Sequence, residues 1–151
     1  MCPTTLTIHY RPTFWHCSTK ERLNLLLDTH VLLWFLADDP HMRPDTLELI
    51  GDPRNDVFVS AASAWEIAIK VKLGKLAVAS NIGKWLPEEL AANRMKPLTI
   101  TVAHAAGVED MPLHHGDPFD RLLIAQARAE NLTIVTSDRG FERYEVPLIL
   151  C

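Results

Sequence analysis

Acidic side chains are the residues of this chain whose types and positions offer the most chemistry. Each candidate follows an apolar run or lies inside or at the start of an expected helix: Asp28, Glu66, Asp117, Asp120 and Asp138. Two unit charges about 5 Å apart repel by roughly 3 kcal/mol at an effective dielectric of about 20, so such a cluster needs protons or a cation. Oxygen ligands favour Mg²⁺ or Mn²⁺. The implied chemistry is metal-assisted attack on a phosphoryl centre.

The elements that must position these acids alternate between strands and helices. Apolar runs predict strands at 25–27, 57–59, 98–100, 132–135 and 147–150. Helices are expected at 29–37, 45–50, 61–73, 82–94, 102–108 and 118–130. Pro44 and Pro118 suit a first helical position, and Ser60 and Asp117 suit helix N-caps. The alternation predicts an α/β fold, a three-layer sandwich with a central parallel sheet and helices on both faces.

This architecture places the acids at one edge of the sheet. Ligands of open parallel sheets bind beyond the carboxyl ends of the strands. Asp28 ends the first strand, and Asp138 lies three residues beyond the strand at 132–135. Glu66 lies one to two turns into the helix after the second strand, while Asp117 and Asp120 lie in the first turn of theirs. Four separate segments are therefore predicted to converge.

Each acid also has a purely structural interpretation. Asp28 could cap the following helix, and Asp138 could belong to a turn. Asp117 and Asp120 fit the N-cap and third position of a capping box, and for Asp117 we favour that role. The joint placement at strand ends nevertheless favours a shared site.

Glu66 has a structural alternative as well, since Lys70 four residues on could pair with it on a solvated helix face. Its neighbours are mostly apolar, however, so its carboxylate needs a partner or a cation.

Composition bounds the class of protein. Of 151 residues, 48% are hydrophobic and 23% charged, which is typical of a globular domain. A net charge of −4 argues against coating nucleic acid by bulk charge, although it permits an enzyme with a small site. Cys2, Cys17 and Cys151 fit neither a zinc site nor a disulfide scaffold, so a reducing cytoplasmic compartment is expected. The most apolar run, 25–37, is too short for a membrane span.

The first 23 residues lack any periodic pattern. We expect an N-terminal extension over 1–23, either loosely ordered or a mis-assigned start of the reading frame. The compact domain is then expected at 24–151.

Four blocks of sequence together resemble the PIN domain, and more closely the VapC-type toxins of prokaryotic type II toxin–antitoxin pairs. They are LLLDTHVLLW at 25–34, SAASAWEIAIK at 60–70, HGDPFDRLLIAQA at 115–127 and TSD at 136–138. The resemblance implies a Mg²⁺-dependent endoribonuclease in which Mn²⁺ substitutes. Its catalytic and metal-binding quartet would be Asp28, Glu66, Asp120 and Asp138. Asp120 matches the family helix, and Asp117 is the second choice.

The resemblance also implies partners. These are an RNA substrate, a second copy of the chain in a homodimer, and a cognate VapB-like antitoxin that covers the acidic site; no membrane is implied. Thr29 and Ser137 occupy hydroxyl positions beside the acids, where they would orient metal-bound waters.

Basic and aromatic residues are the remaining candidates. Lys70 and Arg121 are the first candidates for RNA contacts, ahead of Lys72, Lys75 and Arg139. His114 and His115 are expected to contact RNA or order their loop rather than bind zinc. The tryptophans expected in the core or an interface are Trp34, Trp65 and Trp85.

Two other functions remain open. A PIN fold could hold RNA or a protein without cutting. A different Mg²⁺-dependent phosphohydrolase is the other alternative, although His30 stands where a haloacid-dehalogenase-like phosphatase needs a second Asp. The sequence has no GxGxxG or P-loop pattern for nucleotide phosphates.

Overall fold

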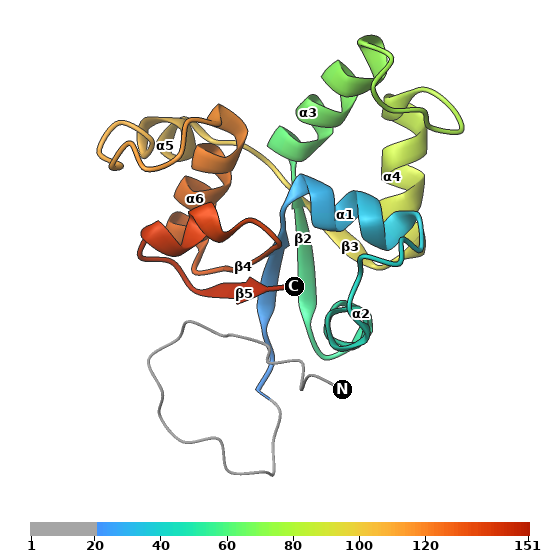
Figure 1. The fold of residues 1–151 in the computed structure, drawn as a ribbon, viewed down its shortest axis with the longest axis horizontal. Coiled ribbons are helices and arrows are strands. Elements are labelled where there is room, and N and C mark those ends of the chain that lie inside the picture. Colours follow the sequence, from blue (N-terminus) through green and yellow to red (C-terminus); the bar gives the residue numbers. More distant parts are fainter. Residues whose placement is uncertain (1–20) are drawn as a thin grey trace.

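The computed structural model describes residues 21–151 (Figure 1). The expected extension over 1–23 therefore lies almost wholly outside the described residues, and the division at residue 24 stays a prediction. Among the described residues, no helix is both long and apolar enough to cross a membrane.

A five-stranded parallel sheet forms the centre of the molecule, with strand order β3-β2-β1-β4-β5. The strands are β1 (Asn24–Leu27), β2 (Asp56–Ser60), β3 (Met95–Leu98), β4 (Thr133–Thr136) and β5 (Leu148–Leu150). The predicted parallel sheet is confirmed, but β3 begins three residues earlier than expected. This edge strand carries Lys96 and Pro97 and so lacks an apolar run; proline is tolerated at an edge because one side of the strand makes no ladder bonds.

The helices follow the strands much as predicted. They are α1 (Thr29–Leu36), α2 (Pro44–Gly51), α3 (Ala61–Lys72), α4 (Ile82–Ala92), α5 (Val102–Ala106) and α6 (Pro118–Glu130). Pro44 and Pro118 occupy first-turn positions, and the Ser60 hydroxyl caps α3 by accepting from the backbone N–H of Ala62 at 3.0 Å. A 3-10 helix, η1 (Arg139–Arg143), was not anticipated.

Two apolar layers cover the two faces of the sheet, which confirms the three-layer arrangement. Successive residues of β1 point to opposite faces, as the period of a strand requires. Leu25 and Leu27 pack with residues of α1, α3 and α4, whereas Leu26 packs with α6 and η1. Figure 1 shows α1 to α4 on one side of the sheet and α5 and α6 on the other.

Candidate active site

Asp28 lies where β1 ends and is both a helix cap and a buried acid. Its Oδ1 accepts from the backbone N–H of Val31 at 2.9 Å, and its Oδ2 accepts from the hydroxyl of Thr136. The residue is 3% exposed. Burial raises the pKa of Asp28, although the Thr136 and Val31 hydrogen bonds oppose this rise. The capping role considered for Asp28 is therefore present, and its second carboxylate oxygen lies at the carboxyl end of the sheet.

Thr136, the last residue of β4, links two of the acids. Its hydroxyl donates to Asp28 and accepts from the backbone N–H of Asp138 at 3.0 Å. The sequence indicated Ser137 for a hydroxyl role and missed Thr136, although it stands in the same Thr-Ser-Asp block. Thr29 was also expected to orient waters, but its buried hydroxyl donates to Ser63 Oγ at 3.0 Å and joins α1 to α3.

The start of α6 contributes two acids with different surroundings. Asp117 is the N-cap, and its Oδ1 accepts from the backbone N–H groups of Phe119 at 2.8 Å and Asp120 at 3.4 Å. The capping role favoured for Asp117 is thus confirmed. Burial raises the pKa of Asp120 to about 7, with further increases from the charges of Asp117, Asp28 and Glu66. Three acids from other positions in the chain are therefore close enough to act on the Asp120 carboxyl.

Glu66 lies on α3 with a side chain only 12% exposed. Lys70 Nζ is 2.7 Å from its Oε1, so the expected ion pair four residues apart is present. The pair does not screen Glu66 fully, because its charge still raises the pKa of Asp120. Glu66 is thus part of the same electrostatic cluster.

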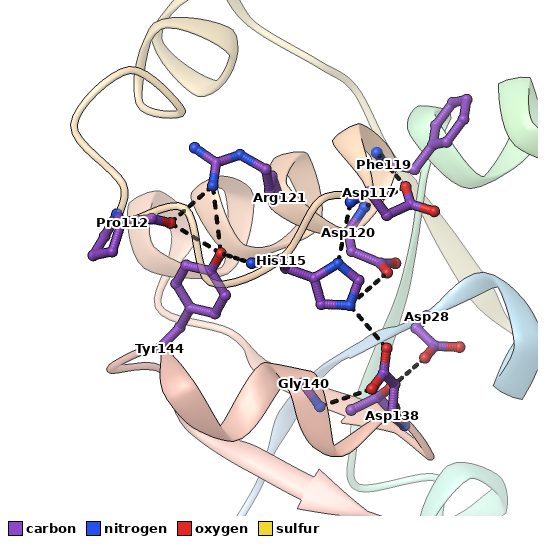
Figure 2. A network of polar contacts seen from close by, with 11 residues as sticks. Asp28, Pro112, His115, Asp117, Phe119, Asp120, Arg121, Asp138, Gly140 and Tyr144 are labelled. Atoms are coloured by element: carbon purple, nitrogen blue, oxygen red, sulfur yellow. Dashed lines mark hydrogen bonds and ion pairs between the residues drawn. The ribbon is translucent and has the colours of Figure 1, made fainter.

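His115 bridges the two acids that approach it from α6 and from the turn after β4 (Figure 2). Its Nε2 lies 2.8 Å from Asp138 Oδ2 and 3.2 Å from Asp120 Oδ2. The hydrogen bond to His115 lowers the pKa of Asp138, and the backbone N–H of Gly140 lowers it further by donating to Oδ1 at 2.7 Å. Sequence reasoning placed His115 in a loop-ordering or RNA-contacting role and did not connect it to the acids.

The donors around this space suit a divalent cation. One ligand atom from each of His115, Asp120 and Asp138 lies within 4.8 Å of the others. Asp28 adjoins them through Thr136, and Figure 2 shows the carboxylates of Asp28, Asp120 and Asp138 around one space. A carboxyl whose pKa reaches about 7 lacks enough compensating positive charge, and a divalent ion would supply it.

Arg121 corrects one expectation. It is 8% exposed, and its guanidinium donates to the carbonyl oxygens of Pro112 at 2.8 Å, Val108 at 3.1 Å and Met111 at 3.2 Å. The expected RNA contact is not supported by this placement, because the donors point into the loop before α6. The sequence shows that Arg121 is charged, but it does not show which carbonyl groups accept its hydrogen bonds.

The tryptophans divide between the core and the surface. Trp34 and Trp85 are partly buried against the core that contains Leu25, as expected. Trp65 is 61% exposed, and its ring lies edge-on to Phe119 with centroids 5.2 Å apart. Trp65 therefore is not a core residue.

Comparison with known proteins extends this description. A family model described as PIN domain matches residues 25–147. Ribonuclease VapC16 of Mycobacterium tuberculosis is 31% identical over 113 residues, which cover 70% of this chain and 69% of the relative. Ribonuclease VapC22 of the same organism is 28% identical over 124 residues, covering 82% and 93%.

Solved structures share the fold. A chain from the crystal structure of VapBC2 from Rickettsia felis bound to a DNA fragment from its promoter has a TM-score of 0.63 at 19% identity, covering 83% of this chain and 97% of that one. A chain of DNA-bound VapBC from Salmonella typhimurium has a TM-score of 0.54 at 18% identity, covering 83% and 96%. The family match and the likeness to VapC16 show that this chain belongs to the PIN domain family and is related to the VapC ribonuclease toxins of VapBC toxin–antitoxin systems.

Proposed function

We propose that this chain is a Mg²⁺-dependent endoribonuclease that hydrolyses RNA phosphodiesters, with Mn²⁺ able to replace Mg²⁺. One observation carries the proposal: burial, and then the charges of Asp117, Asp28 and Glu66, raise the pKa of Asp120 to about 7. Such repulsion is costly unless a cation relieves it. Membership of the PIN family and likeness to two ribonucleases supply the reaction class.

In this proposal the metal ligands are Asp28, Glu66, Asp120 and Asp138. When bound, Mg²⁺ supplies a water of lowered pKa and neutralises charge on the phosphodiester. The protein keeps the carboxylates in place before metal and RNA arrive. Backbone N–H groups hold one oxygen of Asp28 and one of Asp138, so these side chains need little rearrangement.

Asp117 remains the second choice for the third metal ligand. Its Oδ1 is used as the N-cap of α6, and its charge still contributes to raising the pKa of Asp120. We therefore assign it to holding the start of α6 and to the local negative field.

Lys70 is the RNA contact that we retain. Its side chain is 28% exposed and its ammonium lies 2.7 Å from Glu66 Oε1, so it stands next to the acidic cluster and within reach of solvent. A phosphate entering the site could share the Lys70 ammonium with Glu66, since an ammonium carries three donors.

We further propose a toxin role with a VapB-like antitoxin as partner, a homodimeric state and a cytoplasmic location. The two solved structures compared above are described as VapBC assemblies, which supports the antitoxin. The acidic site would favour an antitoxin segment that presents a basic side chain, because this would offset the charge of the carboxylates.

The test compares the purified chain with its Asp28→Asn variant on total RNA, with sequencing of new 5′-phosphate ends. Asn is as good an N-cap as Asp, so the variant should fold while losing a metal ligand. We expect Mg²⁺-dependent ends from the unaltered chain only, and chelation should abolish them. Equal cleavage by the variant would contradict the site. Metal-independent RNA binding without new ends in either protein would instead indicate a non-catalytic module.

A further inference from the structure

His115 holds its ring in an orientation that determines which nitrogen carries the proton. The residue lies in the loop between α5 and α6. The backbone N–H of Asp117 donates to His115 Nδ1 at 3.2 Å. A ring nitrogen that accepts a hydrogen bond carries no proton, so the neutral imidazole has its proton on Nε2.

That proton faces the carboxylates. Nε2 lies 2.8 Å from Asp138 Oδ2 and 3.2 Å from Asp120 Oδ2 (Figure 2). A nitrogen can bind a metal only through its lone pair, and a metal-bound histidine usually donates its other N–H to an acceptor. Here the other nitrogen meets a donor, the N–H of Asp117. Closeness of the three potential ligand atoms therefore does not make His115 a ligand.

We propose that His115 is a positioning residue that holds the Asp138 and Asp120 carboxylates for the metal and is not itself a metal ligand. This inference rests on the proposed metal site. The N–H donated to Asp138 Oδ2 and the backbone N–H of Gly140 donated to Oδ1 engage both oxygens of that carboxylate. The remaining lone pairs of this carboxylate then point in a fixed direction. Metal binding therefore costs less conformational entropy.

Contacts on two sides of the His115 imidazole fix its position. The Tyr144 hydroxyl accepts from the backbone N–H of His115 at 2.8 Å and donates to the Pro112 carbonyl at 3.0 Å, while Arg121 donates to the same carbonyl. On the other side, a Cβ at Gly140 would lie 2.8 Å from His115 Cδ2 and 3.1 Å from Nε2. The ring thus lies against a backbone position where only glycine leaves room.

The experiment titrates each protein with MnCl₂ alone and follows free Mn²⁺ by electron paramagnetic resonance. The temperature is kept below the thermal unfolding midpoint of every variant. We expect His115→Ala to weaken Mn²⁺ binding by about tenfold or more, the effect typical of losing a partner of a metal ligand. His115→Gln keeps an N–H donor at the reach of Nε2 and should remain within about threefold of the unaltered chain. Gly140→Ala should also weaken binding while removing no polar side-chain atom, because its Cβ would lie 2.8 Å from His115 Cδ2 and 3.0 Å from Asp138 Oδ1 and so displace the ring and the carboxylate together.

Two spectroscopic measurements separate positioning from ligation. Long-range ¹H–¹⁵N correlation in the metal-free chain should show the Nε2–H tautomer, and electron spin echo modulation of the Mn²⁺-loaded chain should show no directly bound nitrogen. The Nδ1–H tautomer, a bound nitrogen that disappears in His115→Gln, or His115→Ala binding within about twofold of the unaltered chain would each overturn the inference. Failure of the unaltered chain to bind Mn²⁺ would contradict the proposed metal site instead, and the tautomer would still decide the inference about His115.

Discussion

The two ends of the sheet carry carboxylates in opposite electrostatic settings. At the amino end, Asp56 begins β2 and lies between Lys96, whose Nζ is 2.9 Å from Oδ1, and Arg22, which contacts Oδ2. These hydrogen bonds lower the pKa of Asp56. At the carboxyl end, burial raises the pKa of both Asp28 and Asp120. Asp56 is thus stabilised as an anion, whereas Asp28 and Asp120 are destabilised as anions; Asp138 beside them differs because His115 and Gly140 lower its pKa.

The difference separates an acid that is neutralised within the chain from two acids of the proposed metal site, Asp28 and Asp120, whose charge the chain does not balance. Asp56 has two cations of the chain beside it, so its charge is already balanced. Asp120 lies beside Asp117, and the single imidazole of His115 opposes only part of the repulsion. Perturbed pKa values in a cluster of acids are typical of functional sites, because a bound cation can offset the repulsion.

The largest effect is expected from the matched pair Asp28→Asn and Asp56→Asn. Removing a metal ligand at the carboxyl end should lower Mg²⁺-dependent RNA cleavage on the order of 100-fold or more. The same change at the amino end should leave cleavage within about twofold. Initial cleavage rates of both variants at equal folded concentration provide the measurement, and comparable losses in the two would remove the distinction between the ends.

Asp120→Asn should raise the stability of the metal-free chain, in a pH-dependent way. The pKa of Asp120 is about 7 in the folded chain against an ordinary 3.8. Below about pH 4 Asp120 is protonated in both the folded and the unfolded chain and costs no stability. As the pH rises to about 7, the unfolded chain ionises more easily than the folded one, and the free energy of unfolding falls. Allowing for solvent around a side chain that is 21% exposed, the gain should reach about 2 kcal/mol above pH 7.

Urea unfolding of both proteins between pH 5 and 8, in the presence of a chelator, measures that gain. The charged and titratable neighbours that contribute are Asp117, His115, Asp28 and Glu66. A difference that stays constant over this range would show that Asp120 is not the titrating group.

Added Mg²⁺ should stabilise the unaltered chain but not Asp28→Asn. A ligand present at about tenfold its dissociation constant contributes roughly 1.4 kcal/mol to the free energy of unfolding. Thermal unfolding at pH 7.5 with and without MgCl₂, and with NaCl at matched ionic strength, provides the readout. An equal rise in the midpoint for both proteins would point to general screening of charge.

The smallest effect is expected for Lys70→Ala, with Lys84→Ala as its control. Lys70 lies beside Glu66 on α3, whereas Lys84 is exposed on α4. Loss of one phosphate contact should raise KM for RNA roughly three- to tenfold and weaken its salt dependence. Lys84→Ala should change neither, and equal changes in both would reduce Lys70 to part of the general surface charge.

Much of the architecture was predictable because it follows from local rules. Ser60, Pro118 and Asp117 begin their helices where their backbone and capping chemistry requires. Strand β3 was misplaced because its exposed edge position permits Lys96 and Pro97 and so removes the apolar pattern. The helix before it also ends earlier than expected, as Arg94 turns the chain with a φ of 56°.

The placement of the acids in the fold was predictable, but the side chains that contact them were not. The positions of Asp28 and Asp138 at strand ends follow from the order of elements. The roles of Thr136, His115 and Arg121 depend on atoms 108, 23 and 9 residues away in the chain, and no local pattern encodes such pairs. Arg121 shows the risk, since its charge suggested RNA while its guanidinium donates to three nearby carbonyl groups and to the Tyr144 hydroxyl.

Hydrophobic periodicity, capping residues and the order of elements thus determined that the chain forms a parallel sheet with acids at its carboxyl edge. These are properties of short segments and need no knowledge of distant residues. Packing decided what each polar group does, because burial and neighbouring charge exist only once segments meet. Three features depend on such tertiary contacts: the raised pKa of Asp120, the lowered pKa of Asp138 and the close approach of the His115 ring to Gly140.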